Sequence, residues 1–386
     1  MKLKPILFEN TGELLGYSKS KAPMPRFVIL DLTRRCNLHC FMCNVHMDDT
    51  CSEPKHYEDM SDELFEKTLP VLSRAEMIQL GGCGEPFISR NILARLKRIR
   101  EHNPSVYLSS FTNGLRFAEE RFTGEALPLF NELHVSVNGV SNYESVMNGA
   151  SKERLLKALQ TIQNIREKCG KPERLVMGFI LMKRNLDDIG DAAKLAKQFG
   201  FSAIQYKNLW VFDDTLKPES VQHNPDLAKK AKREIRKAAS TGLPIDCEPW
   251  PEMNTPKTEA PNQSSHYSAL RTSTRRAQTA AKLLLFNQKQ FIGKIQPILR
   301  RSFAKYKPLC TFPWEQIQIF ENGDVFLCCF GVTNIGDYNE NDFASIWHGN
   351  EVRRYREGIL SRRYYKDCAR CKLIVKDDPS VFDKPK

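Results

Sequence analysis

The sequence has no apolar run that reaches the roughly 18 residues of a membrane-spanning helix. Its opening stretch, Met1 to Gly16, is interrupted by Pro and Glu, so we expect no secretory signal peptide there. The chain nevertheless contains 12 cysteines. Without export signals, such cysteines stay reduced or bind metal instead of forming disulfides. These absences predict a cytoplasmic protein whose cysteines are reduced thiols or metal ligands.

The length of 386 residues allows one large α/β domain and a smaller one. Hydrophobic residues make up 41% of the chain and charged residues 27%, which is typical of a folded globular protein and argues against extended disorder.

Three cysteines in the run RRCNLHCFMCN carry the strongest functional signal: Cys36, Cys40 and Cys43. The spacing C-x3-C-x2-C places three thiolates on one short loop, where they can ligate three irons of a four-iron, four-sulfur cluster. The fourth iron then has no protein ligand and can bind a small molecule. Zinc is the alternative, with His39 or His46 as the fourth ligand, although structural zinc sites usually use two C-x2-C pairs.

The loop follows an apolar, β-branched run, Arg26 to Thr33, that reads as a buried strand. It therefore lies past the carboxyl end of a strand, where α/β folds place their chemistry. This motif resembles the signature of the radical SAM superfamily. The resemblance implies that S-adenosylmethionine (SAM) chelates the open iron, and that its reductive cleavage yields a 5'-deoxyadenosyl radical that removes a hydrogen atom from substrate. Where the family usually has an aromatic residue before the third cysteine, this chain has Met42, and we expect Met42 to cover the adenine.

Further SAM contacts are implied by the same resemblance. The segment MIQLGGCGEPF resembles the glycine-rich turn that binds the SAM amino group through its backbone, and the matching residues are Gly82, Cys83, Gly84 and Glu85. Candidates for contacts to the ribose and carboxylate stand near the ends of later strands: Asn113, Ser136, Asn138 and Asn185. The alternative for each position is an ordinary turn residue, since Gly and Asn-Gly are common turn formers.

Strand-like and helical runs alternate through the first half of the chain. The expected strands are Phe27 to Thr33, Glu76 to Leu80, Val106 to Phe111, His134 to Asn138, Leu175 to Met182 and Ala203 to Leu209. The expected helices are Ser61 to Arg74, Asn91 to His102, Ala118 to Phe130, Lys152 to Cys169 and Leu186 to Phe199. Such repeats with short connections predict an α/β fold, a partial (β/α)6 TIM-like barrel spanning 26–212 after an N-terminal extension, 1–25. The radical SAM family has the same core.

A second cysteine set lies near the C-terminus: Cys310, Cys328, Cys368 and Cys371. Between the first two, Asn322-Gly323 predicts a hairpin. The arrangement, within 310–386, is similar to the auxiliary-cluster domain called SPASM in its shortened twitch form. That resemblance implies one auxiliary four-iron cluster with all four ligands from cysteine, and a zinc site is the alternative. We expect the neighbouring Cys329 to be a buried thiol or, alternatively, a hydrogen-atom donor.

The segment 213–309 is predicted to be a basic insert. From Lys229 to Lys307 it has 17 Lys or Arg and 5 Asp or Glu, an excess that equals the whole chain's net charge of +12. Its end, 277–307, has apolar residues at near-helical spacing with basic residues between them. Such a helix either packs on the barrel or contacts an anionic membrane surface or a phosphorylated substrate. Nucleic acid is a weaker alternative because no recognition motif is present.

The sequence therefore predicts a radical SAM enzyme of oxidoreductase type that oxidises or rearranges a sugar-like, anionic or lipid-linked small molecule, with the auxiliary cluster in electron transfer. The implied electron donor is a protein such as flavodoxin or ferredoxin. Radical modification of a ribosomal peptide is the first alternative, and a zinc-stabilised nucleic-acid-binding protein is the second. No acid or base is assigned, although Glu53, His56, Glu248 and Glu315 are available.

Overall fold

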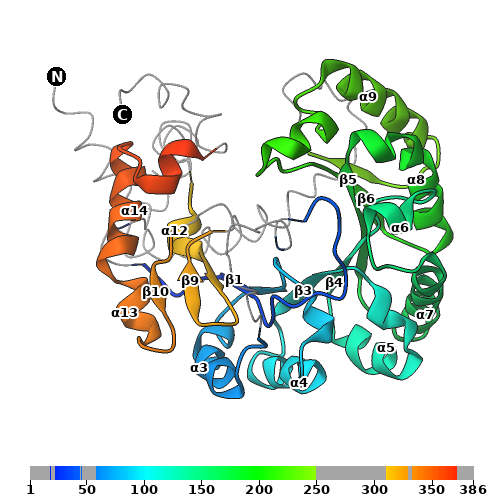
Figure 1. Ribbon diagram of the computed structural model, residues 1–386. Coiled ribbons are helices and arrows are strands. Elements are labelled where there is room, and N and C mark those ends of the chain that lie inside the picture. Colours follow the sequence, from blue (N-terminus) through cyan, green and yellow to red (C-terminus); the bar gives the residue numbers. More distant parts are fainter. Residues whose placement is uncertain are drawn as a thin grey trace, which may run out of the picture. The chain divides into compact units, whose positions relative to one another are not determined.

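The computed structural model describes residues 18, 22–43, 45, 58–248, 310–328 and 333–371 (Figure 1). By their contacts, the residues divide into two units. The core unit comprises Arg26–Thr255 together with Gln318–Asp324. The C-terminal unit comprises Met1–Pro25, Pro256–Ile317 and Val325–Lys386.

A parallel sheet forms the centre of the core unit, with its strands in chain order. The strands are β1 (Phe27–Leu30), β2 (Met77–Leu80), β3 (Tyr107–Thr112), β4 (Glu132–Ser136), β5 (Arg174–Leu181), β6 (Ala203–Asn208) and β7 (Ile245–Cys247). The six predicted strands are all present, with ends shifted by a few residues, and β7 was not predicted. The sheet with its helices confirms the predicted partial TIM-like barrel, extended by one strand.

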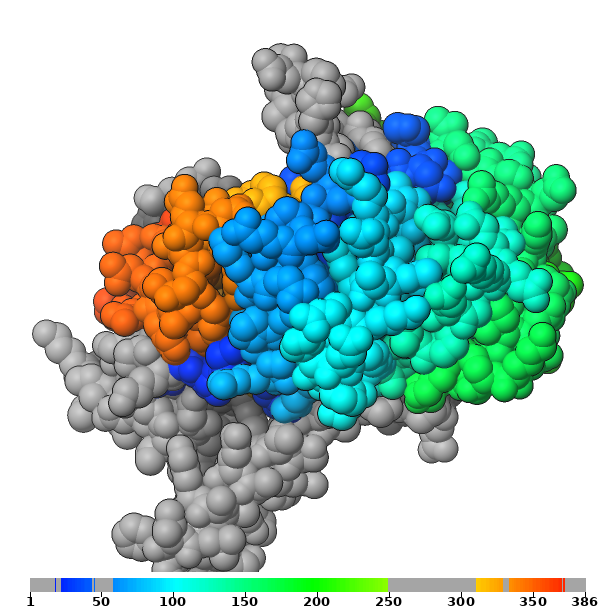
Figure 2. Space-filling view, turned by 90° about the horizontal axis from the view of Figure 1, so that it is seen from below, coloured from blue at the N-terminus to red at the C-terminus, as the bar shows by residue number. Residues whose placement is uncertain are grey.

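Helices cover the outer face of this sheet (Figure 1). They are α3 (Asp62–Leu72), α4 (Ile92–His102), α5 (Glu120–Ala126), α6 (Tyr143–Val146), α7 (Lys152–Cys169), α8 (Ile189–Gln198) and α9 (Pro225–Ala239). Short 3-10 turns occupy Pro86–Ile88, Leu115–Ala118, Leu127–Leu129, Lys183–Asp188 and Asp214–Glu219. Local chemistry sets the ends: the Ser61 hydroxyl accepts a hydrogen bond from Leu64 N (3.0 Å) and caps α3. Gly170 ends α7 in the left-handed conformation, at φ 69°. Figure 2 shows α3, α4 and α5, blue to cyan, forming a continuous outer surface.

The two faces of the sheet differ in character. Most side chains toward the helices are apolar and fully buried, as Leu133 and Val135 are in β4. Side chains toward the opposite side, which we call the concave face, include several polar residues: Gln79, Ser109, Glu132, His134, Ser136, Gln205 and Lys207. The helix-facing side also includes Ser110 and Thr112, which pair with Leu133 and Val135, but most charged side chains of these strands lie on the concave face.

The core unit continues past residue 212, where the predicted core domain ends. The segment from residue 213 to Glu248 belongs to the core unit because β7 pairs with β6 and α9 packs on α8. The tip of the predicted hairpin, Gln318–Asp324, also belongs to the core unit, where Asp31 N donates to Ile319 O (2.9 Å). The predicted amphipathic helix, 277–307, lies outside the described residues.

The remaining elements are α12 (Phe312–Glu315), β8 (Gln316–Ile319), β9 (Asp324–Phe326), β10 (Gly336–Asp337), α13 (Phe343–Trp347), α14 (Asn350–Ser361) and a 3-10 turn, Lys366–Arg370. The predicted hairpin is confirmed: Gly323, at φ 95°, connects β8 to β9. The C-terminal unit packs around Trp314, Ile359 and Leu360.

Within the described parts of the chain, no helix is both long and apolar enough to span a membrane.

Candidate active site

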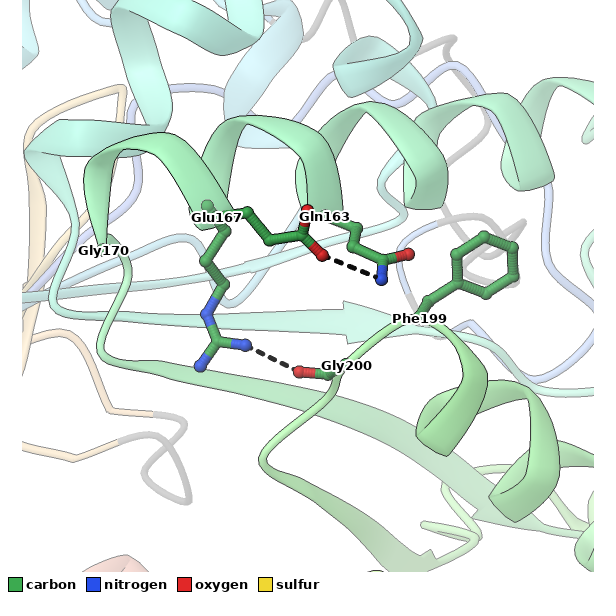
Figure 3. A pocket seen from close by; sticks show the side chains of 6 residues that line it. Gln163, Glu167, Gly170, Phe199 and Gly200 are labelled. Carbon is green, nitrogen blue, oxygen red and sulfur yellow. Dashed lines mark hydrogen bonds between the residues drawn. The ribbon is translucent and has the colours of Figure 1, made fainter.

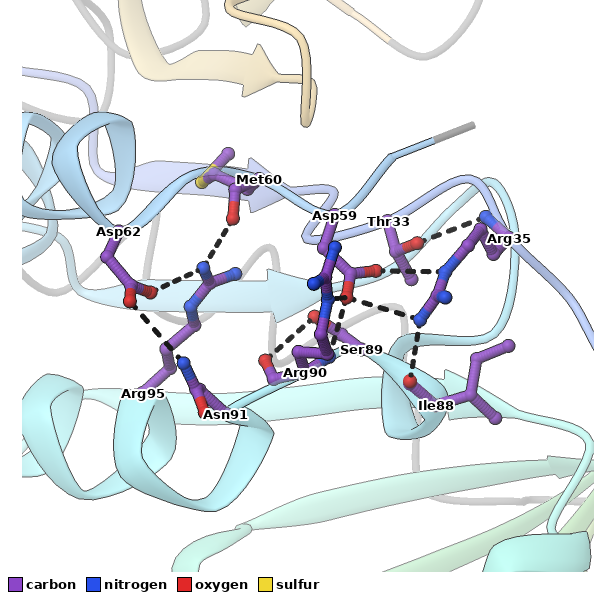
Figure 4. A network of polar contacts seen from close by, with 10 residues as sticks. All are labelled: Thr33, Arg35, Asp59, Met60, Asp62, Ile88, Ser89, Arg90, Asn91 and Arg95. Carbon is purple, nitrogen blue, oxygen red and sulfur yellow. Dashed lines mark hydrogen bonds and ion pairs between the residues drawn. The ribbon is translucent and has the colours of Figure 1, made fainter. Parts of the chain in front are cut away.

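The cysteine loop begins where β1 ends, and a salt bridge fixes its start. Arg35, directly before the first cysteine, donates from Nε to Asp59 Oδ1 (3.1 Å) and from Nη2 to Ile88 O (3.1 Å) (Figure 4). Arg90 N also donates to Asp59 Oδ2 (2.7 Å). Burial acts to raise the pKa of Asp59, but these hydrogen bonds, one from Thr33 and the Arg35 charge outweigh it and lower that pKa. The ionised Asp59 therefore holds the cysteine loop next to Arg90, just before α4.

The middle of the loop is held from its other side. His39 N donates to Asn148 O (2.8 Å), just past α6, and Phe41 N donates to Val146 O (3.0 Å), the last residue of α6. The guanidinium of Arg184 lies 3.4 Å from the centroid of the Phe41 ring, a cation–π contact. The loop is therefore fixed by main-chain bonds, which do not depend on the cysteines themselves.

The cysteine thiols of this loop are electrostatically coupled. Burial first, then the charges of Glu85 and Cys43, raise the pKa of Cys36 to about 11. Burial, then Cys43 and Cys36, raise the pKa of Cys40 to about 12. Thiols held in this way become thiolates when a metal cation binds them. Within the described ranges, no three metal-ligating side chains converge tightly enough for a single metal ion. Three coupled thiols on one loop fit a cluster with one open iron.

The glycine-rich turn after β2 packs directly against the cysteine loop. Gly84 has a φ of 75°, and a Cβ there would lie 2.7 Å from Thr33 O and Arg35 O. Glu85 N donates to Arg35 O (2.8 Å). Only glycine allows this approach without strain, so the turn and the cysteine loop form one rigid piece.

The Glu85 carboxyl is fully engaged by the protein. It accepts hydrogen bonds from Thr112 Oγ1 (2.7 Å), Asn113 N (2.7 Å) and Phe87 N (3.3 Å). Burial raises the pKa of Glu85 to about 7. The main chain of the turn, and not this carboxyl, is therefore the part that can meet a ligand.

Two of the predicted polar SAM contacts, Asn113 and Ser136, stand at strand ends. Asn113 Nδ2 donates to Asn37 Oδ1 (2.8 Å), which ties the end of β3 to the cysteine loop. Ser136 ends β4 on the concave face. Met42 is buried, with 7% of its surface exposed.

The two later asparagines join strand ends. Asn138 Oδ1 accepts from Ile180 N (2.8 Å), and Asn185 Nδ2 donates to Asn138 O (2.8 Å). Asn185 Oδ1 also accepts from Met182 N (2.8 Å). A ligand that bound either amide would have to replace these bonds.

A buried carboxylate that sequence reasoning missed supports the glycine-rich turn. Asp31 is fully buried and accepts from Cys83 N (3.1 Å) and from Gln318 Nε2 (2.7 Å). Burial raises the pKa of Asp31 to about 6. Nearby, Arg34 Nε lies 3.2 Å from Glu321 Oε1. The available signal was the aspartate inside the apolar run VILDL.

An outer groove of about 220 Å³ lies at the C-terminal ends of α7 and α8 (Figure 3). Arg166 Nη1 donates there to Gly200 O (2.6 Å), and Gln163 donates to Glu167 (3.1 Å). Since the protein engages these polar groups, the groove joins two helices and offers no catalytic group.

The four C-terminal cysteines are coupled to one another within their own unit. Burial first, then Cys310, Cys328 and Cys371, raise the pKa of Cys368. Cys371 N donates to Cys368 O (3.4 Å), and Cys368 packs against the cluster of Trp314, Ile359 and Leu360. Cys329 lies outside the described residues.

The four available acids and bases receive no support from the structure. Glu53 and His56 lie outside the described residues. Glu248 accepts a hydrogen bond from Asn208 N (2.9 Å), and Glu315 accepts one from a threonine hydroxyl (2.7 Å).

Comparisons with known proteins agree with this geometry. A family model described as the radical SAM superfamily matches residues 30–196, and one for SPASM, an iron–sulfur cluster-binding domain, matches 310–372. A tungsten-containing aldehyde ferredoxin oxidoreductase cofactor-modifying protein of Pyrococcus furiosus is 24% identical over 250 residues, which cover 60% of this chain. The match spans 64% of that relative's length, less than two thirds.

Two solved structures share the fold. The SuiB protein of Streptococcus suis bound to SAM is 14% identical, with a TM-score of 0.54, over 91% of this chain and 71% of that one. The protein anSMEcpe with bound SAM is 16% identical, with a TM-score of 0.56, over 90% of this chain and 84% of that one.

The matched regions contain the two cysteine sets, and the cofactors of such a chain are four-iron, four-sulfur clusters and SAM. The chain belongs to the radical SAM superfamily and carries a C-terminal SPASM domain.

Proposed function

We propose that this enzyme abstracts a hydrogen atom from a small sugar-like or anionic molecule and oxidises or rearranges it. Cys36, Cys40 and Cys43 would hold the SAM-binding cluster. A second set would hold one auxiliary cluster: Cys310, Cys328, Cys368 and Cys371. When bound, the first cluster and SAM supply reductive cleavage and hydrogen abstraction, and the second exchanges electrons.

The observation that carries this proposal is the close contact between the cysteine loop and the glycine-rich turn. Gly84 brings the turn against Thr33 and Arg35, and the Arg35–Asp59 salt bridge holds the loop. These contacts support a single ligand site between the thiols and the main chain of the turn. Pre-organisation of this kind lowers the barrier because little reordering remains when substrate binds.

Peptide modification is the second candidate, because structures of SuiB with its precursor peptide and of anSMEcpe with peptides share this fold. The tungsten cofactor-modifying relative supports a small molecule instead. The proposed electron donor is a protein such as flavodoxin or ferredoxin. Contact of 277–307 with a membrane stays a prediction.

Metal analysis and SAM cleavage test the proposal. Anaerobic purification should give about eight irons per chain, and incubation with SAM and a strong reductant should release 5'-deoxyadenosine. Cys40→Ala should abolish that release, while Cys169→Ala, which changes an exposed cysteine outside both sets, should preserve it. Two zinc ions in place of iron would instead support the zinc-stabilised nucleic-acid-binding protein.

A further inference from the structure

A histidine–carboxylate pair lies on the concave face of β4. His134 and Glu132 are two residues apart on the strand, so both side chains point to the same side of the sheet. His134 Nε2 lies 2.7 Å from Glu132 Oε1. Neighbouring strands fix the carboxylate: Tyr107 OH donates to Glu132 Oε2 (2.7 Å), and Arg174 Nε lies 3.0 Å from Oε1. The imidazole therefore has a rigid, charged partner on one side.

This partner determines which ring nitrogen carries the proton. Burial acts to raise the pKa of Glu132, but His134, Tyr107 and Arg174 outweigh it and lower that pKa to about 2. An ionised carboxylate only accepts hydrogen bonds, so Nε2 is the protonated nitrogen and Nδ1 holds a lone pair. Nδ1 is buried and has no hydrogen-bond partner among the described residues. A buried polar atom without a partner needs an explanation, and a ligand is one.

The surroundings keep the ring neutral and place a cation beside it. Burial, followed by the charges of Lys207 and Arg174, lowers the pKa of His134 despite the opposing effect of Glu132. The ring packs at 4.5 Å against Phe111 on β3, and Lys207 Nζ lies 4.3 Å from the centroid of the same Phe111 ring. A basic nitrogen and an ammonium group therefore share one aromatic neighbour.

We propose that Nδ1 of His134 accepts the proton of a substrate hydroxyl group, and that Lys207 stabilises the oxyanion so formed. The O–H bond breaks with its electron pair left on oxygen, an Nδ1–H bond forms, and Glu132 balances the resulting imidazolium. A hydroxyl can both donate to Nδ1 and accept from Lys207, whereas an ionised carboxylate has no proton to give. The inference rests on the proposed function and narrows its substrate to a hydroxyl-bearing molecule.

A coloured phenol tests this site without knowledge of the substrate. The probe is 4-nitrophenol, whose phenolate absorbs visible light, added to the full-length, cluster-loaded protein. Wild type should bind it and increase the phenolate fraction, and His134→Gln should weaken binding at least about tenfold. The matched control His102→Gln, on the outer helix α4, should bind as wild type does. Equal binding by His134→Gln, or no binding by wild type, would overturn the proposal and leave Nδ1 to a structural water.

A second variant covers the case in which His134→Gln does not fold. Lys207→Met removes the cation and keeps an unbranched apolar side chain, so it should bind the phenol with a smaller phenolate signal. An unchanged signal would overturn the role of Lys207.

Saturation with SAM distinguishes a substrate hydroxyl from a ribose hydroxyl of the cofactor. Phenol binding that persists with SAM supports the substrate assignment, and competition by SAM overturns it. SAM cleavage without substrate should be similar in wild type and His134→Gln. Its absence in both would contradict the proposed function, not the proton acceptor.

Discussion

The two cysteine sets are held in different ways. The core set lies on one short loop whose main chain bonds to Val146 and Asn148, while Arg35 is bound by Asp59. The C-terminal cysteines are spread from Cys310 to Cys371, and two of them, Cys310 and Cys368, pack against the cluster of Trp314, Ile359 and Leu360. The first set has three coupled thiols and the second has four. Three thiols suit a cluster with one iron open to a ligand, and four thiols suit a cluster whose irons are all bound by the protein.

This difference implies separable roles. A loop fixed by its own main chain can keep its shape when a ligand enters or leaves. A site assembled from distant segments depends on its metal and its packing for order. Substitutions in the two regions should therefore affect different measurements.

The largest difference is expected for removal of one ligand from each set. Cys43→Ala should lose SAM cleavage entirely, because the open cluster cannot form with two thiolates. Cys371→Ala should lose about half of the iron but keep cleavage of SAM without substrate. Iron analysis and 5'-deoxyadenosine measurement on both variants check this. Loss of cleavage in Cys371→Ala would show that the two sites are not separable.

The next effect concerns the close contact between turn and loop. Gly84→Ala puts a Cβ 2.7 Å from Thr33 O at a φ of 75°, so the variant should lose on the order of 3 kcal/mol in free energy of unfolding. Gly124→Ala in α5 adds a Cβ that meets no neighbouring side chain or loop within 4 Å, so its free energy of unfolding should rise by about 0.5–1 kcal/mol. Urea unfolding measures both. Equal stability of the two variants would contradict the contact.

The salt bridge that fixes the loop gives a pH-dependent effect. Asp59→Asn should lower the free energy of unfolding by about 2 kcal/mol at pH 7, because Arg35 and Arg90 lose their buried, ionised partner. The folded pKa of Asp59 is below 3.8, so its contribution is complete above that value and is lost as the pH falls through the folded pKa. The unfolding free energies of wild type and Asp59→Asn, measured at several pH values, should therefore converge in acid.

The control for that variant is Asp62→Asn. The Asp62 side chain pairs with Arg95 but is 71% exposed, so its loss should cost no more than about 1 kcal/mol. A cost as large as that of Asp59→Asn would mean that burial is not the cause.

The smallest effect is expected in the C-terminal unit. Trp347 Nε1 donates to Pro23 O (2.8 Å), so Trp347→Phe should lower the unfolding free energy by about 1 kcal/mol. Trp210→Phe, at a side chain that is 55% exposed, should change it little. SAM cleavage should be unaffected in both, and a loss in Trp347→Phe would link this unit to the first step.

The sequence predicted those parts of the fold that have strong periodicity. Both ends of α7 were predicted, and the structure gives their physical cause: Ser151 caps the start and Gly170 follows the end. The helix α9 was missed although Leu227, Ala231, Ile235 and Ala238 recur at helical spacing, because its basic residues were assigned to the insert.

The site was predicted through its spacing motifs and missed where partners are distant in sequence. The loop cysteines and the glycine-rich turn have local signatures. The predicted fourth strand began at His134, so Glu132 stood outside it and their shared face went unnoticed. The partner of Asp31, Gln318, lies in a segment that was expected to belong to another domain.

The assignment of Gln318–Asp324 to the core unit limits how the enzyme can be shortened. A fragment that ends before residue 310 would leave Asp31 buried without Gln318 and Arg34 without Glu321. A minimal SAM-cleaving fragment would therefore need new residues at Asp31 and Arg34. Simple removal of the C-terminal cysteines would also remove Gln318, which bonds the same aspartate that supports the glycine-rich turn.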